Sequence, residues 1–369
     1  MSLKTILIKP ASSMCSMSCD YCFYCDEAEK RTQKSMGLMS EETLKNIIRK
    51  MLLQASSDVC FAFQGGEPTL RGLSFFQKAV ELEQMYNRNH VQVTNTLQTN
   101  GLWLTEDWCR FFHDHQFLIG ISVDGTEETH NQCRRTKEGE ATYGRILHSI
   151  RLLDAYQVDY NILTVVNAYT APKIQEIYTD YKKNGWLFQQ YIPCMDPLGE
   201  TPGSHPYSLT PEMYGEFLIR LFRLWHKDWK RGKAPYIRDF ENYIGILMGY
   251  QPEACSQRGI CSIQGVTEAD GSVYPCDFYA VDSYYLGNIN QNKIREFSEN
   301  PTAEKFIAES RNISDVCRSC PYYHLCRGGC RRNRVFSDGS YRNYFCRSYQ
   351  MFFEKTLHLM QEMAVYLRK

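Results

Sequence analysis

Three closely spaced cysteines near the start of the chain have the types and spacing to do chemistry. Cys15, Cys19 and Cys22 follow the pattern Cys-x3-Cys-x2-Cys within residues 13–23. Three thiolates on one loop can hold three irons of a [4Fe–4S] cube and leave the fourth iron open to another ligand. A zinc site is the alternative, because zinc usually takes four ligands and Cys25 could serve as the fourth.

A glycine-rich turn, Gln64-Gly65-Gly66-Glu67-Pro68, follows the second predicted strand. Its glycines let a backbone approach a ligand closely, and its glutamate can accept a hydrogen bond from an ammonium group. The run Ser122-Val123-Asp124-Gly125 ends the fourth predicted strand and could reach a ribose. Taken alone, each of these motifs is also compatible with a plain turn.

A second group of cysteines lies in the last third of the chain, several of them in Cys-x2-Cys, Cys-x3-Cys and Cys-x5-Cys pairs. Eight thiolates suffice for two fully ligated [4Fe–4S] clusters. One or two structural zinc ions would use the same residue type, so the local pattern leaves both open. The eight are Cys255, Cys261, Cys276, Cys317, Cys320, Cys326, Cys330 and Cys346.

One carboxylate lies directly beside this second group, since Asp277 follows Cys276. Fully ligated clusters have no open iron for a substrate, so their simplest uses are electron transfer and structural support. An oxidation needs an electron acceptor and a base, and Asp277 is positioned to take a proton near the point where an electron leaves. A surface or capping aspartate is the other interpretation.

The elements that must position these motifs alternate between strand and helix. This alternation indicates βαβ units and a parallel sheet. Six units form a partial barrel or an open sheet, and in both the ligand site lies at the carboxyl ends of the strands. We predict strands over residues 5–8, 59–63, 91–97, 117–123, 160–166 and 187–191, and helices over 41–53, 73–86, 106–113, 143–156 and 174–183.

A loop rich in Pro, Gly and Ser over residues 193–211 marks a change of character. An amphipathic helix is predicted over residues 212–230, and a last helix over about residues 347–367. We therefore expect an α/β protein whose first domain is formed by residues 1–230. Residues 231–369 form a smaller cysteine-rich domain closed by the last helix.

The composition sets limits on location and partners. The 369 residues include 42 Lys and Arg and 42 Asp and Glu, and a net charge of zero argues against a broad electrostatic grip on nucleic acid. No apolar run approaches the ~20 residues that span a bilayer, and the N-terminus is too short and too interrupted for a signal peptide. We expect a cytoplasmic protein whose 16 cysteines are reduced, the clustered ones as metal ligands.

The first three cysteines resemble the cluster motif of the radical S-adenosylmethionine (SAM) superfamily, in which an aromatic residue accompanies the last cysteine. The Gly-Gly-Glu-Pro turn matches the superfamily motif that meets the SAM amino group. The resemblance implies a partial (β/α)6 barrel, with SAM on the open iron and split there into methionine and a 5′-deoxyadenosyl radical. The superfamily's glycine-rich motif on the fifth strand is not visible in residues 164–168. The implied SAM contacts are Tyr21, Gly66, Ser122, Arg134 and Met195.

The C-terminal cysteines resemble the SPASM extension of radical SAM enzymes, which carries two auxiliary clusters. The resemblance therefore implies three [4Fe–4S] clusters in all. By position, the first auxiliary cluster takes Cys255, Cys261, Cys276 and Cys330. The second takes Cys317, Cys320, Cys326 and Cys346.

Runs at residues 8–13, 61–70, 97–101, 274–279 and 326–332 narrow the resemblance to anaerobic sulfatase-maturating enzymes. These enzymes oxidise a Cys or Ser of a sulfatase to Cα-formylglycine, and the carboxylate at the Asp277 position is their catalytic base. The resemblance implies as partners a nascent or unfolded sulfatase polypeptide and an electron donor such as flavodoxin or ferredoxin. It implies no nucleic acid and no membrane.

Two other classes stay open. Another SPASM enzyme could form thioether or carbon–carbon crosslinks in a peptide, although many of those carry an N-terminal peptide-recognition domain and this chain starts almost on its first strand. A non-enzymatic iron–sulfur or zinc protein would have no use for the Gly-Gly-Glu-Pro turn. The sequence does not separate a Cys target from a Ser target. It assigns packing roles to Cys60 and Cys109 and no role to Cys25, Cys133 or Cys194.

Overall fold

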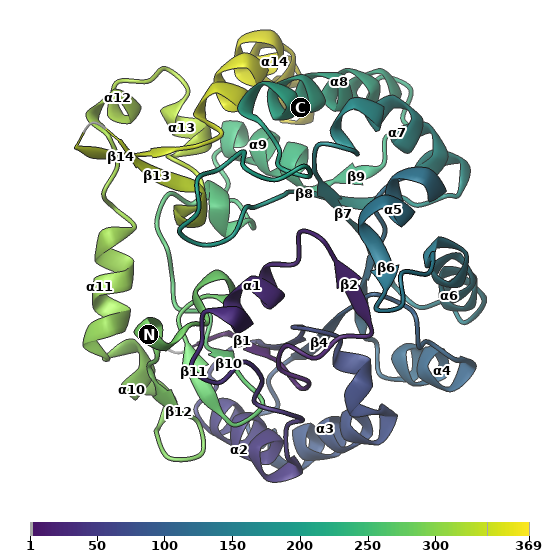
Figure 1. Cartoon of the computed structure of the whole chain (residues 1–369), viewed down its shortest axis with the longest axis vertical. Coiled ribbons are helices and arrows are strands. Elements are labelled where there is room, and N and C mark those ends of the chain that lie inside the picture. The colour runs from purple at the N-terminus through teal and green to yellow at the C-terminus, as the bar shows by residue number, and fades with distance from the viewer. Residues whose placement is uncertain (1–2, 338, 369) are drawn as a thin grey trace. The chain divides into compact units, whose positions relative to one another are not determined.

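Figure 1 presents the structure, a computed structural model that describes residues 3–337 and 339–368. Its internal contacts divide the chain into two units, each assembled from separate stretches. Of the described residues, unit 1 takes in 3–122, 134–160 and 262–306, and the remainder form unit 2. The chain returns to unit 1 twice, so residues far apart in the sequence pack together there.

Unit 1 is built on a sheet in the strand order β12-β11-β10-β1-β3-β4-β5. From β10 to β5 neighbouring strands run parallel, whereas β10, β11 and β12 pair antiparallel. Along β3 buried and half-buried residues alternate, as the two-residue period of a strand requires. The strands are β1 (Thr5–Ile8), β2 (Met17–Cys19), β3 (Val59–Phe63), β4 (Val93–Thr99), β5 (Leu118–Ser122), β6 (Arg134–Thr136), β10 (Val266–Thr267), β11 (Ser272–Tyr274) and β12 (Gly287–Asn288).

Amphipathic helices cover the outer side of this sheet, where Figure 1 shows α2 and α3 side by side. The Ser40 side chain caps α2 by accepting from the Thr43 N–H at 3.1 Å. The helices are α1 (Phe23–Glu29), α2 (Glu41–Leu53), α3 (Leu73–Tyr86), α4 (Glu106–Asp114), α6 (Tyr143–Ala155) and α10 (Ile294–Ser298), with short 3₁₀ turns at Pro68–Arg71, Asp277–Tyr279 and Asp282–Tyr284. Helix α11 (Pro301–Glu309) runs from unit 1 into unit 2.

Unit 2 combines three parallel strands, in the order β7-β8-β9, with a helical layer and a separate hairpin of β13 and β14. Thr210 caps α8 by accepting from the Met213 N–H at 3.2 Å, and Pro211 occupies the first turn. The strands are β7 (Tyr160–Val166), β8 (Phe188–Pro193), β9 (Tyr236–Ile237), β13 (Arg334–Ser337) and β14 (Ser340–Asn343). The helices are α5 (Glu127–Cys133), α7 (Ile174–Lys183), α8 (Pro211–Trp229), α9 (Arg238–Met248), α12 (Asp315–Arg318), α13 (Tyr323–Cys326) and α14 (Cys346–Leu367), with 3₁₀ turns at Ala171–Lys173, Cys255–Gln257 and Arg331–Asn333.

These elements confirm the predicted α/β fold, and the parallel strands followed by helices are those of a partial barrel. The predicted strands and long helices agree with the structure to within two residues at each end. Prediction missed the three-residue strands β2 and β6, which pair with each other, because so short a run shows no periodicity. Among the described residues, no helix is both long and apolar enough to cross a membrane.

An aromatic cluster joins α8, α9 and α14 and tests the packing of unit 2. The Phe222 ring is fully buried, with its centroid 5.2 Å from that of Phe240 and 5.9 Å from that of Phe352. We expect Phe222→Ala to lower the free energy of unfolding by about 3–5 kcal/mol, because the ring's contacts are lost and a cavity remains. Phe188 is 53% exposed, so Phe188→Ala should cost about 0.5 kcal/mol or less. Urea denaturation followed by tryptophan fluorescence compares the two, and equal losses would contradict this packing.

Candidate functional site

The three N-terminal cysteines lie on a loop between β1 and α1 and are half-buried. Cys19 lies in β2, which pairs with β6 so that Cys19 stands opposite Arg134. Cys22 is the N-cap residue of α1. The loop is therefore anchored on one side by a pair of short strands and on the other by a helix.

Two neighbouring strand ends hold this loop in place. The Met14 carbonyl accepts from the Glu67 N–H at 2.8 Å, which ties the loop to the turn after β3. The Asn100 side-chain amide, after β4, lies 3.1 Å from Ser16 Oγ and 3.6 Å from Cys15 Sγ. The carboxyl ends of β1, β3 and β4 thus meet at the cysteines, where a parallel α/β sheet binds its ligands.

Gly66 is required for this arrangement. Its φ is +52°, and a Cβ there would lie 2.2 Å from the Met14 carbonyl oxygen. No side chain fits at that distance, so only glycine lets the turn after β3 approach the cysteine loop. The sequence predicted a close approach of backbone to ligand, and the structure contains a close approach of backbone to the loop that carries Cys15.

The glutamate of the same turn is fully engaged inside the protein. Glu67 is completely buried, and its Oε1 accepts from the Thr69 N–H and hydroxyl at 3.0 and 2.7 Å and from the Thr99 hydroxyl at 2.8 Å. Its Oε2 accepts from the Asn100 N–H at 2.7 Å. Burial raises the pKa of Glu67, while these donors oppose the shift. The carboxylate of Glu67 thus joins two strand ends, and its predicted bond to an ammonium group stays a prediction.

Four of the five predicted SAM contacts lie in unit 1. The Arg134 guanidinium lies 5.6 Å from the centroid of the Tyr21 ring. Gly66 adjoins the cysteine loop, and Ser122 is the last residue of β5. Met195 follows β8 in unit 2. The structure thus brings Tyr21 and Arg134 together.

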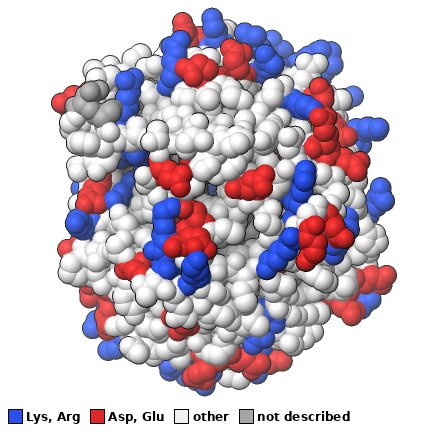
Figure 2. Space-filling model, viewed as in Figure 1, with Lys and Arg blue, Asp and Glu red and all other residues white. Residues whose placement is uncertain are grey.

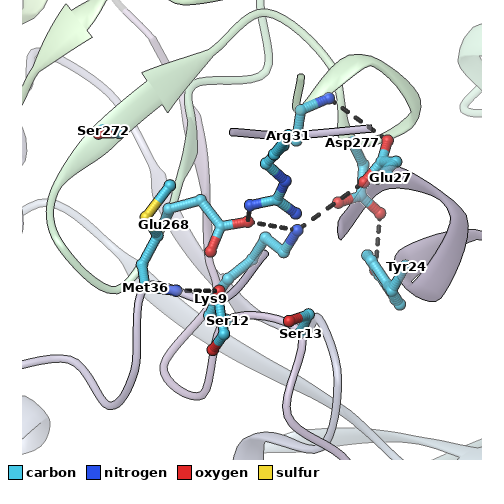
Figure 3. A network of polar contacts seen from close by, with 12 residues as sticks. Lys9, Ser12, Ser13, Tyr24, Glu27, Arg31, Met36, Glu268, Ser272 and Asp277 are labelled. Carbon is cyan, nitrogen blue, oxygen red and sulfur yellow. Dashed lines mark hydrogen bonds and ion pairs between the residues drawn. The ribbon is translucent and has the colours of Figure 1, made fainter. Parts of the chain in front are cut away.

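Asp277 is buried in unit 1, and its two carboxylate oxygens differ (Figure 3). The Tyr24 hydroxyl and the Gln64 amide both donate to Asp277 Oδ2, each at 2.7 Å. Among the described residues, nothing donates to Oδ1. Tyr24 lies on α1, which Cys22 caps, and Gln64 opens the turn that carries Gly66. One oxygen is therefore oriented by α1 and by the turn after β3, which flank the cysteine loop, and the other is open to accept a proton.

A cluster of buried charges adjoins Asp277, as Figure 3 shows. Lys9 Nζ lies 2.7 Å from Glu268 Oε1 and 3.9 Å from Glu27 Oε2, and Arg31 donates to the same Glu268 oxygen at 2.6 Å. Burial disfavours the charged form of Lys9, but Glu268, Glu27 and Asp277 together hold its pKa above the usual value. Burial likewise raises the pKa of Glu27 to about 8 and that of Asp277 above its usual range, and Lys9 opposes both shifts. These partners were not predicted, because no local pattern marks them.

In unit 2 the C-terminal cysteines gather in two sets. Burial raises the pKa of Cys330, and the nearby thiols of Cys255 and Cys261 raise it further. Burial also raises the pKa of Cys326, and the thiols of the other three members of its set add to the shift. The second set is Cys317, Cys320, Cys326 and Cys346, all within unit 2. Cys276 belongs to unit 1, directly before Asp277.

The arrangement of the thiols can be compared with what zinc and [4Fe–4S] clusters each require of their ligands. Among the described residues, no three His, Cys, Asp or Glu side chains converge on a position for one metal ion. Zinc needs such convergence, since its ligands share a single ion at about 2.3 Å. In a [4Fe–4S] cluster each thiolate binds a different iron, so the sulfurs lie farther apart. The C-terminal thiols stand in a group of three and a group of four, as ligands of [4Fe–4S] clusters can.

The remaining cysteines differ in exposure. Cys109, Cys133 and Cys194 are buried, and Cys60 is half-buried within β3. Cys25 is exposed on the first turn of α1, and its backbone N–H donates to the Cys22 carbonyl at 3.1 Å.

Two family models match parts of the chain, and known proteins match nearly all of it. The radical SAM superfamily model matches residues 10–180, and the model of the SPASM iron–sulfur cluster-binding domain matches residues 261–321. The cysteine-type anaerobic sulfatase-maturating enzyme of Clostridium novyi (strain NT) is 42% identical over 98% of this chain and 97% of its own length. The serine-type enzyme of Bacteroides thetaiotaomicron is 30% identical over 97% of this chain and 90% of its own length.

A solved structure agrees with the sequence matches. Native anSMEcpe with bound AdoMet and the Cp18Cys peptide superimposes with a TM-score of 0.93 and 40% identity, covering 98% of this chain and 99% of that one. The fold, both family models and the relatives that match over nearly their full length thus indicate the same family. The chain is a radical SAM enzyme with a SPASM domain, and it belongs to the family of anaerobic sulfatase-maturating enzymes.

Proposed function

We propose that this enzyme oxidises an active-site cysteine of a sulfatase polypeptide to Cα-formylglycine, with Asp277 as the catalytic base. One observation carries the proposal. Asp277 Oδ1 is buried and accepts from none of the described residues, while Oδ2 accepts from Tyr24 on α1 and from Gln64 in the turn after β3. A buried carboxylate oriented in this way has one open lone-pair site, where a substrate thiol can deliver its proton.

The cofactors supply the radical and the electron acceptor. When bound, SAM on a reduced [4Fe–4S] cluster yields methionine and a 5′-deoxyadenosyl radical that removes a hydrogen atom from the substrate Cβ. We propose Cys15, Cys19 and Cys22 as the ligands of that cluster, and Tyr21, Gly66, Ser122, Arg134 and Met195 as the SAM contacts. The proposed auxiliary ligands are Cys255, Cys261, Cys276 and Cys330 for one cluster and Cys317, Cys320, Cys326 and Cys346 for the other.

A residue of the chain then accepts a proton from the substrate. The carbon radical still carries the S–H group, and passing this proton to Asp277 makes the radical a stronger reductant. One electron must then leave, for which the auxiliary clusters, when bound, would be the acceptor, and hydrolysis of the resulting thioaldehyde yields formylglycine and hydrogen sulfide. Burial raises the pKa of Asp277, whereas Lys9 and the hydrogen bonds from Tyr24 and Gln64 lower it and so favour the anion that the proposed step requires.

Cysteine is proposed as the target because the identity to the cysteine-type enzyme, 42%, exceeds that to the serine-type enzyme, 30%. We further propose that the radical SAM domain ends near residue 230 and that a flavodoxin or ferredoxin supplies electrons. The two compact units are defined by their internal contacts and not by function. They therefore do not test the division at residue 230, which stays a prediction. A cytoplasmic location likewise stays a prediction.

Anaerobic incubation of the reconstituted protein with SAM, dithionite and paired sulfatase-derived peptides tests the function. The two peptides differ only in Cys or Ser at the target position. We expect formylglycine in the Cys peptide by mass spectrometry, with 5′-deoxyadenosine formed alongside it. A crosslinked peptide in place of formylglycine would assign the chain to peptide crosslinking instead.

Asp277→Asn keeps the shape of the side chain and removes its ability to accept the proton. We expect formylglycine formation to fall about 10²–10⁴-fold, the usual loss of a general base. Cluster content and SAM cleavage should remain, because neither needs this carboxylate. Asp282→Asn is the matched control, since Asp282 is exposed in the same segment. Normal formylglycine output from the Asp277 variant would exclude the proposed base.

Gly66→Ala should disrupt the cysteine loop and with it SAM cleavage. A Cβ at this position would lie 2.2 Å from the Met14 carbonyl oxygen, so either the turn or the loop must move. We expect at least a tenfold loss of 5′-deoxyadenosine yield. Gly72→Ala is the control, because Gly72 also has a positive φ, +85°, but nothing lies within 4 Å of its Cβ position. If the two variants behaved alike, backbone strain rather than the close approach would be the cause.

Replacing Cys15, Cys19 and Cys22 together with Ala should lower the iron content from about twelve to about eight atoms per chain, by the stoichiometry of three [4Fe–4S] clusters. Anaerobic iron and sulfide analysis measures the change. Cys25→Ala should keep all its iron, because three thiolates suffice for the first cluster. Iron loss from Cys25→Ala would favour a four-thiolate site at this loop.

A further inference from the structure

The last part of unit 2 concentrates positive charge, although the net charge of the whole chain is zero. Residues 311–347 contain eight arginines, no lysine and two aspartates, a net charge of +6. Arg311, Arg318 and Arg342 are exposed, and Figure 2 shows basic side chains over the region of β13. A cluster of this kind attracts an acidic partner and speeds its encounter.

Exposed apolar side chains lie among these arginines. Phe336 and Tyr341 stand opposite each other on β13 and β14, with ring centroids 5.1 Å apart, and are 64% and 44% exposed. The Ser314 N–H donates to the Tyr341 carbonyl at 3.0 Å, which brings the start of α12 to the hairpin. Val316 on α12 is 58% exposed. Aromatic groups surrounded by charged ones are the usual composition of a protein docking surface.

We call this area the basic hairpin surface and define it by Arg311, Val316, Arg318, Phe336 and Tyr341. Its residues come from α12, β13, β14 and the segment just before α12, all within unit 2.

The same elements carry thiols of the second auxiliary set. Cys317 lies on α12, and Cys346, three residues after β14, begins α14. The Arg342 side chain hydrogen-bonds to the Cys346 thiol. Successive side chains of a strand point to opposite faces, so Arg342 faces the thiols and Tyr341 faces away from them. The hairpin therefore has one face toward the thiols and an aromatic, solvent-exposed face behind it.

We propose that the basic hairpin surface docks a small acidic electron-carrier protein, of the flavin or iron–sulfur class, that exchanges single electrons with the site formed by Cys317, Cys320, Cys326 and Cys346. The proposal rests on the proposed function, which assigns a cluster to these thiols. In the exchange one electron passes from that site to the oxidised carrier, and the carrier reduced in this way can then supply an electron, as the proposed function requires. No bond forms or breaks and no proton moves. Complexes between redox partners bury less surface than most protein complexes, so a few exposed side chains can form the docking site.

An acidic protein suits this surface better than a nucleic acid. Both would meet the arginines and the aromatic pair. Only an electron carrier, however, gains from the thiols behind the hairpin, because electron transfer requires the two redox groups to come close together.

Charge reversal provides the test. Arg311→Glu/Arg318→Glu changes the charge of the surface by four units and touches none of the proposed ligands. The matched control is Arg220→Glu/Arg223→Glu on the exposed side of α8, in the same unit. The two pairs of arginines also have similar ion pairs. In the first pair Arg318 lies 3.5 Å from Asp315, and in the second Arg220 lies 3.9 Å from Glu216.

The probe is an oxidised acidic flavodoxin, titrated anaerobically against the reconstituted holoenzyme at low ionic strength by calorimetry. We expect the first double variant to bind at least tenfold more weakly than the wild type and the control to stay within twofold. Added salt should weaken wild-type binding, because exposed charges are screened. Equal affinities for wild type and first variant, or equal losses in both variants, would overturn the docking surface. Tighter binding of a single-stranded RNA than of flavodoxin, lost in the first variant, would overturn it as well.

A second readout separates this inference from the function on which it rests. Dithionite needs no docking, so 5′-deoxyadenosine and formylglycine made with dithionite should be the same in the wild type and both variants. A wild type that makes no formylglycine with dithionite would overturn the proposed function, whereas the flavodoxin titration would still decide the docking. If the glutamate variant lost iron, Arg311→Gln/Arg318→Gln, which only neutralises the charge, should still lower flavodoxin affinity several-fold with iron retained.

Discussion

A single buried carboxylate, that of Glu67, holds together the strand ends on which the first cysteine group depends. Four donors from Thr69, Thr99 and Asn100 surround it, and the backbone N–H of Glu67 itself donates to Met14. A buried charge without such partners would cost several kcal/mol, so the donors and the carboxylate require each other. The need of this buried carboxylate for hydrogen-bond donors therefore fixes the positions of the turn after β3, the end of β4 and the cysteine loop relative to one another.

A second buried charge cluster brings a distant segment to the same unit. Lys9, at the end of β1, pairs with Glu268 between β10 and β11, 259 positions later in the chain, and Arg31 pairs with the same carboxylate. The short strands β10 to β12 extend the sheet next to β1. The ion pairs and the added strands together set the position of the segment that carries Asp277. This is how a residue beside a C-terminal cysteine comes to be bonded to Tyr24 on α1.

Features that depend on neighbouring residues could be predicted from the sequence, whereas contacts between residues far apart in the chain could not. Alternating buried residues such as those of β3 predicted each strand, and the cysteine spacings, with the family resemblance, predicted the grouping of Cys317, Cys320, Cys326 and Cys346. The partners of Asp277 could not be found in this way, because Tyr24 and Gln64 are 253 and 213 positions away and neither forms a pattern with it. The donors to Glu67 could not be found from the sequence either, because they become apparent only when β3 and β4 lie side by side.

The charged groups around Asp277 determine how readily the proposed base ionises. Burial raises the pKa of Glu27 to about 8, which favours its protonated, neutral form. Lys9 lowers the pKa of Glu27, Glu268 and Asp277, whereas Glu27 and Asp277 disfavour each other's ionised form. A neutral Glu27 therefore removes a negative charge that would oppose ionisation of Asp277. Tyr24 and Gln64 donate to Asp277 Oδ2, and none of the described residues donates to Oδ1.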